Sequence, residues 1–116
     1  MEKVYPHSVE AEMSVLGTVL MNPEIFEMIY EIVKPEYFYI DAHRTIFEII
    51  SKLRDRKKNI DIVILAEELR NINKLEEIGG MEYLYELVEK VSSPAHSKEY
   101  AEIVKEKYIL RELIKA

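Results

Sequence analysis

Apolar residues recur every three or four positions along most of this chain, between prolines and glycines that are few and widely spaced. Only three glycines and four prolines occur in 116 residues. The opening stretch shows the pattern in Val9, Met13, Leu16 and Leu20, and Ser8 precedes them as a candidate N-cap. Such spacing buries one side of a helix. Repeated along the chain, it predicts an all-α fold of about five to six helices.

The same spacing places the helices that follow. The second begins after a cap at Asn22 and ends at Lys34, which precedes a proline. Asp41 is expected to cap the third helix, and Asp61 the fourth. The inward side of the fourth helix is predicted to hold Val63, Leu65, Ala66 and Leu69. The fifth is expected from Met81 to Val91.

Two features of these helices predict tertiary contacts. Gly17 lies inside the first helix, where glycine costs about 1 kcal/mol relative to alanine, so a close helix approach is expected there. The aromatic residues of "PEYFY", which begins at Pro35, are expected to fill the core.

The last segment, from Ala95 to Ala116, is predicted to be one long helix. Positions a and d of a seven-residue repeat hold Tyr100, Ile103, Lys107, Leu110 and Ile114, with Lys107 as the one interruption. Ile109 and Leu113 widen this apolar face. The stripe has no partner within the chain, so it indicates an interface, or a fragment of a longer helical structure.

Charge and composition exclude several classes of function. The formal net charge of -6 argues against a domain that grips duplex DNA. Five of the seven residues from Lys52 to Lys58 are basic. They either complement the C-terminal end of the third helix or bind phosphate, and the lack of interleaved aromatic residues favours the first. No apolar run approaches the ~20 residues that span a bilayer, and a cytoplasmic, non-membrane protein is expected.

The sequence contains no recognisable catalytic or metal-binding motif. Cysteine is absent, which excludes disulfides and thiolate metal sites. No glycine-rich phosphate loop occurs. His7, His43 and His96 are scattered, and a structural role is expected for His43 in the first turn of its helix. Carboxylates are expected on solvated helix faces. The prediction is a binding or assembly module with no catalytic, cofactor or metal site.

Five blocks of sequence resemble, in order, the N-terminal domain of DnaB-type replicative DNA helicases. They are "PHSVEAEMSVLGTVLMNPEIF", "FYIDAHRTIFEII", "NIDIVILAEELR", "LEEIGGMEYLYELVEKVSSPAHSKEYAEIVKEK" and "LRELI". The resemblance is colinear over nearly the whole chain. Five blocks in the family order are far more specific than any one of them.

The resemblance implies a hexameric, ATP-driven helicase that unwinds DNA at the replication fork. Residues 1–93 would form its N-terminal helical globule, and residues 94–116 would begin a helical hairpin for dimerisation. The motor domain, with ATP, Mg²⁺ and most contacts to single-stranded DNA, would lie outside this chain. The fragment itself would therefore not be an enzyme.

The resemblance also implies partners and residues. Dimers paired through hairpins would build the hexamer, through Tyr100, Ile103, Lys107, Leu110 and Ile114. The helicase-binding domain of primase would contact Asp61, Tyr83 and Ile114. Each of these three has a simpler interpretation: Asp61 as a helix cap, Tyr83 as a half-buried ring with a solvated hydroxyl, and Ile114 as hairpin core.

Two other hypotheses stay open. One is a free-standing helical adaptor, such as a primase-side helicase-binding domain. The other is a small enzyme without a recognisable site.

Overall fold

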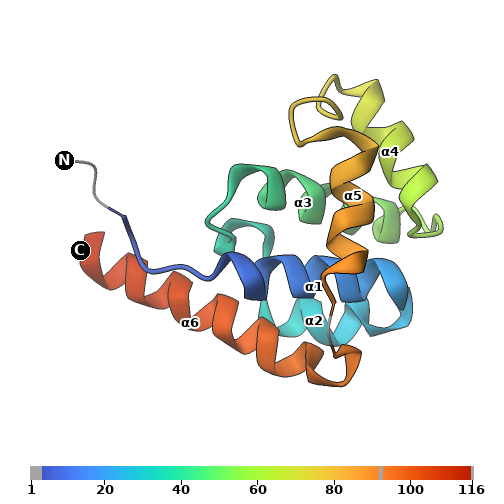
Figure 1. The fold of residues 1–116 in the computed structure, drawn as a ribbon. Helices are drawn as coiled ribbons and strands as arrows, with labels where there is room; N and C mark the ends of the chain where they lie inside the picture. Colours follow the sequence, from blue (N-terminus) through green and yellow to red (C-terminus); the bar gives the residue numbers. More distant parts are fainter. Residues whose placement is uncertain (1–3, 92, 116) are drawn as a thin grey trace.

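Helix α1 (Val9–Met21) is the element around which the other helices pack. In the computed structural model, which describes residues 4–91 and 93–115, all regular structure is helical, and this confirms the all-α prediction. Figure 1 shows α2 (Phe26–Ile32) and α6 (Ser97–Lys115) on one side of α1. On the other side lie α3 (Asp41–Asp55), α4 (Ile62–Asn71) and α5 (Gly80–Glu89).

Three short 3-10 helices connect these elements, and each begins with a proline. They are η1 (Pro23–Ile25), η2 (Pro35–Tyr37) and η3 (Pro94–His96). Proline suits the first position of a helix because it lacks the N–H that would have no partner there. The prolines therefore set where the chain turns between helices.

The prediction of a single apolar stripe on α1 is wrong. Every residue from 11 to 20 is buried, whereas Val9, which was placed on the stripe, is exposed. The reason is that α3, α5 and α6 all contact α1, so no side of its middle turns faces water. Ser8 caps the helix as predicted, since its Oγ accepts from the N–H of Ala11.

The predicted cap at Asp41 is wrong, and the one at Asn22 is confirmed only in position. Asp41 is the first residue of α3, and its carboxylate pairs with Arg44 while Ile40 occupies the cap position. Asn22 is the N-cap residue of η1, with Pro23 following as predicted, but its side chain makes no cap hydrogen bond and η1 separates it from α2. A cap side chain needs one backbone geometry relative to the helix, and sequence position alone does not set it.

The core confirms most of the predicted inward residues. Phe38 of the "PEYFY" stretch is fully buried, and its ring stacks on Phe47 with centroids 4.9 Å apart. Leu65, Ala66 and Leu69 of α4 are buried as predicted, but Val63 is 67% exposed. Helix α4 packs mainly against α3 and α5, and its first turn presents Val63 to solvent.

Gly17 confirms the predicted close approach. A Cβ built at this position would lie 2.1 Å from the carbonyl oxygen of Leu87 in α5. Two atoms cannot be that close without bonding, so the crossing of α1 and α5 requires glycine here.

Replacing Gly17 with alanine is expected to lower the free energy of unfolding by about 2–4 kcal/mol, because the helices must separate. Urea denaturation followed by circular dichroism measures it. Adding Val91→Ala removes the next-nearest group but not the Leu87 carbonyl, so it should not restore stability. Wild-type stability of the single variant would contradict the close crossing.

Candidate functional site

Glu12 lies inside the protein, with 1% of its surface exposed. The expectation that carboxylates occupy solvated helix faces is wrong for this residue. Its Oε2 accepts from the N–H of Tyr39 at 2.8 Å, and its Oε1 accepts from the N–H of Ile40 at 3.2 Å. The third partner is the Nδ1 of His43, 2.8 Å from Oε1. These bonds replace the water that a buried carboxylate loses.

His43 connects this carboxylate to the surface of α5. Its side chain is fully buried, which confirms the structural role predicted for it, and its Nε2 lies 2.6 Å from the hydroxyl of Tyr83. The two rings are stacked, with centroids 5.9 Å apart. Partial burial raises the pKa of Tyr83, and the charges of Glu86 and Glu12 act in the same direction. The Tyr83 hydroxyl therefore stays protonated well above neutral pH.

Arg111 of α6 holds the other side of the segment that Glu12 binds. Its guanidinium donates to the carbonyl of Tyr37 at 2.6 Å and to that of Pro6 at 2.8 Å. Burial lowers its pKa, while the charge of Glu12 acts in the opposite direction. Residues 37–40 are thus bound by Glu12 through their N–H groups and by Arg111 through a carbonyl.

Neither Glu12 nor Arg111 was predicted to be a buried polar residue. A signal for Arg111 did exist, because the side of α6 that faces the core is a second stripe at helical spacing, formed by Ser97, Ala101, Val104, Tyr108 and Arg111. The hairpin stripe predicted on the same helix is more apolar, and it therefore gave the stronger sequence signal. Arginine at a core-facing helical position indicates carbonyl or carboxylate partners.

The residues predicted to contact primase do not form one patch. Asp61 caps α4, with its Oδ1 accepting from the N–H of Ile64 at 2.8 Å. Tyr83 lies on α5, and Ile114 is exposed in the last turn of α6. Figure 1 places the C-terminal end of α6 on the opposite side of the molecule from α4. A partner that touched all three would have to span this distance.

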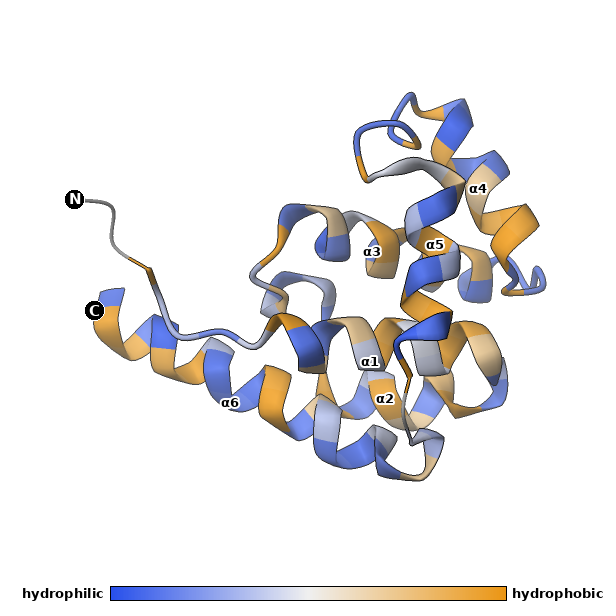
Figure 2. Ribbon diagram, in the orientation of Figure 1, coloured by the Kyte–Doolittle hydropathy of each residue, from blue (hydrophilic) through white to orange (hydrophobic). Residues whose placement is uncertain are grey.

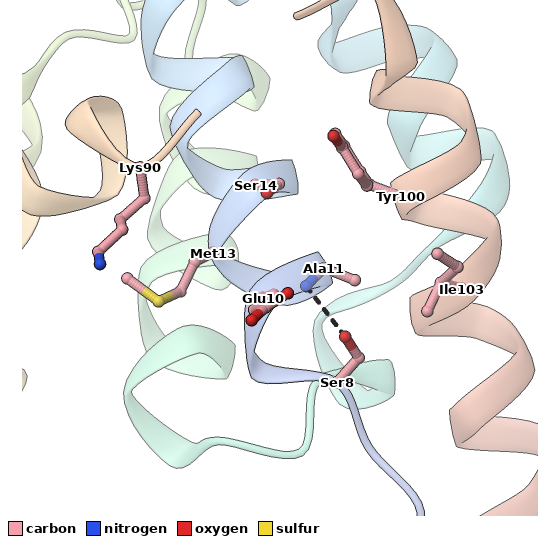
Figure 3. A pocket seen from close by; sticks show the side chains of 8 residues that line it. All are labelled: Ser8, Glu10, Ala11, Met13, Ser14, Lys90, Tyr100 and Ile103. Atoms are coloured by element: carbon pink, nitrogen blue, oxygen red, sulfur yellow. Dashed lines mark hydrogen bonds between the residues drawn. The ribbon is translucent and has the colours of Figure 1, made fainter. Parts of the chain in front are cut away.

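The stripe predicted for the hairpin divides into two parts. Tyr100 and Ile103 are partly buried and line a pocket of about 310 Å³ beside α1, together with Met13 and Lys90 (Figure 3). Lys107 is half-buried in the middle of the helix.

The last turns of α6 carry an exposed apolar group, here called the α6 tip, that consists of Ile109, Leu110, Leu113 and Ile114. Figure 2 shows hydrophobic segments along this end of α6. Between 38% and 67% of each of these aliphatic side chains is exposed, so much of the tip faces water.

Three of the five basic residues from Lys52 to Lys58 form ion pairs with carboxylates of this chain. Lys52 pairs with Glu48 at 3.3 Å, Arg54 with Glu27 at 3.2 Å, and Arg56 with Glu68 at 2.6 Å. These ion pairs agree with a local electrostatic role. The other interpretation, that the cluster binds phosphate, stays a prediction.

Within the described ranges, no three histidine or carboxylate side chains come together as a potential metal site. Across the same residues, no helix has the length and apolar character needed to traverse a bilayer.

Comparison with known proteins gives consistent matches. A family model described as "DnaB-like helicase N terminal domain" matches residues 4–106. The replicative DNA helicase DnaB of Geobacillus stearothermophilus is 43% identical over 114 residues, which are 98% of this chain and 25% of that protein. The chain spans about a quarter of the length of such curated relatives.

Two solved structures share the fold. The N-terminal domain of DnaB helicase from Mycobacterium tuberculosis has a TM-score of 0.92 at 36% identity, covering 97% of this chain and 81% of that chain. A structure described as that of a DnaB-like replicative helicase and its interactions with primase has a TM-score of 0.84 at 29% identity. It covers 93% of this chain and 25% of that chain.

Glu12→Gln is expected to lower the free energy of unfolding by about 2–4 kcal/mol. The amide NH₂ replaces one acceptor oxygen, leaves a buried N–H unpaired and removes the charge near Arg111. Urea denaturation measures the effect, and Glu10→Gln, on the exposed side of the same helix, is the matched control. Equal stability of the two variants would show that the buried carboxylate is not needed.

Proposed function

This chain belongs to the family of DnaB-like helicase N-terminal domains, and from this membership we propose that it is the oligomerisation and primase-interaction domain of a hexameric replicative helicase. Unwinding of duplex DNA, ATP hydrolysis with Mg²⁺ and most contacts to single-stranded DNA belong to a motor domain in the rest of that protein. The chain described here contributes binding surfaces and no catalytic group.

The α6 tip is the observation that carries the oligomerisation role. Four aliphatic side chains in two helical turns are exposed, and contiguous apolar surface of this kind marks a protein interface. A second helix laid along the tip would bury them in the manner of a helical hairpin. Residues 94–116 would then begin the hairpin, and dimers formed through it would build the ring.

The primase role is supported by the family and by the rigid placement of Tyr83. One structurally similar protein is a replicative helicase described with its interactions with primase. In this chain the Tyr83 ring is half-exposed, and its hydroxyl is held by the buried His43. A fixed aromatic side chain at a surface is a typical anchor in protein interfaces.

The alternative hypothesis is a free-standing helical adaptor, such as the helicase-binding domain on the primase side. The family model and the relatives are those of the helicase, so they support the helicase side. Turnover of ATP or of a phosphoester by the purified chain would instead favour the small-enzyme hypothesis.

We expect a form extended by about 40 residues of its natural continuation, enough for a returning helix, to dimerise. Leu113→Lys with Ile114→Lys should weaken that association at least about tenfold, because charged groups would have to be desolvated at the contact. Light scattering after size-exclusion chromatography measures it.

The matched control for this experiment is Val63→Lys. It places one such lysine on an aliphatic residue of α4 that is as exposed as Leu113, and association should be unchanged. An extended wild-type form that stays monomeric at high concentration would refute the oligomerisation role.

We expect Tyr83→Ala to weaken binding to the helicase-binding domain of primase at least about tenfold in isothermal titration calorimetry. Asp61→Ser should test the charge of Asp61 separately, because serine still caps α4. Unchanged affinity in both variants would remove these residues from the primase surface.

A further inference from the structure

The Tyr83 hydroxyl is the outer end of a polar chain that runs from the middle of the protein to its surface. The chain consists of Glu12 in α1, His43 in α3 and Tyr83 in α5, with contacts of 2.8 Å and 2.6 Å. Its two inner members are buried, and only the tyrosine reaches solvent. The buried members, Glu12 and His43, therefore determine whether the Tyr83 hydroxyl donates or accepts in this chain.

The direction follows from the carboxylate. An ionised Glu12 can only accept, so the Nδ1 of His43 must carry a proton and donate. In a neutral imidazole the other nitrogen, Nε2, is then an acceptor. The Tyr83 hydroxyl, 2.6 Å away, must donate its hydrogen inward to Nε2.

The imidazole of His43 is fully buried, and burial disfavours an added charge on a side chain. The carboxylate of Glu12 lies 2.8 Å from its Nδ1, and Arg111 of α6 lies near that carboxylate. Arg44 of α3 is paired with Asp41. On α5, the charge of Glu86 acts on Tyr83.

We infer that His43 is neutral with its proton on Nδ1, so that the Tyr83 hydroxyl donates its hydrogen inward. A partner then meets Tyr83 as a hydrogen-bond acceptor and must itself donate, through a lysine or arginine side chain. A basic donor fits the surface of α5, which has exposed Glu82, Glu86 and Glu89 and no basic residue between Gly80 and Glu89. This inference rests on the proposed function, in that Tyr83 is taken to contact the partner protein.

The direction of the hydrogen bond can be measured without a partner. Long-range ¹H–¹⁵N correlation spectra of the chain labelled at histidine are expected to show His43 neutral, with its proton on Nδ1, and His7 and His96 serve as internal references. Tyr83→Phe should shift the Nε2 resonance of His43, whereas Tyr85→Phe on the same helix should not. An imidazolium, or a proton on Nε2 alone, would overturn the inference.

Binding to the helicase-binding domain of primase tests the partner chemistry. Site-specific 3-fluorotyrosine at position 83 makes the hydroxyl a stronger donor and a weaker acceptor, so affinity should fall about twofold. Tyr83→Phe should lose about tenfold, the value of a hydrogen bond to a charged donor, and Tyr85→Phe less than twofold. Tighter binding of the fluorinated protein, or an equal loss in Tyr85→Phe, would overturn the inference.

A different result would show that the proposed function is wrong. If Tyr83→Ala binds primase as well as the wild type, Tyr83 is not a contact and the proposed partner role fails. The histidine spectra would still decide whether the Tyr83 hydroxyl points inward.

Discussion

The buried carboxylate of Glu12 is the interaction on which the arrangement of the helices depends. A charge in the interior is tolerated only when hydrogen bonds and a counter-charge replace water. Here the donors come from the segment that leads into α3 and from His43, and Arg111 of α6 supplies positive charge nearby. One side chain of α1 therefore binds the start of α3 and, through His43, is linked to Tyr83 of α5. Among the described residues, no buried polar side-chain atom lacks a partner.

A steric constraint complements this polar one. The absence of a side chain at Gly17 lets α5 cross α1 at contact distance, while the polar chain fixes the same helix at Tyr83. Helix α5 is therefore positioned by a close contact at Gly17 and by a hydrogen bond at Tyr83. A preorganised surface loses little entropy on binding, which suits a domain whose proposed role is to receive a partner. The α6 tip is a separate, apolar surface on another helix, and Ile114, which is predicted for both interactions, belongs to it.

Some helix caps and most core positions could be predicted from the sequence. Ser8 and Asp61 cap their helices as predicted, because a cap bond joins positions three apart in the chain. Leu65, Ala66 and Leu69 were correctly placed in the core by their spacing. The errors, at Val9, Val63, Asn22 and Asp41, concern exposure and geometry at helix ends. Those depend on which neighbouring helix covers a turn, and spacing along one helix does not contain that information.

By itself, the sequence determined the all-helical class, the order of the helices, the family and the need for a close approach at Gly17, since each depends on local spacing or on ordered motifs. Only the tertiary structure decided that Glu12 and Arg111 are buried, that His43 joins Glu12 to Tyr83, and that Asp61, Tyr83 and Ile114 lie apart. The physical reason is that a charged side chain is buried only where donors and acceptors from elsewhere surround it. For Glu12 those groups lie 27–31 residues along the chain, and for Arg111 they lie 74 and 105 residues away.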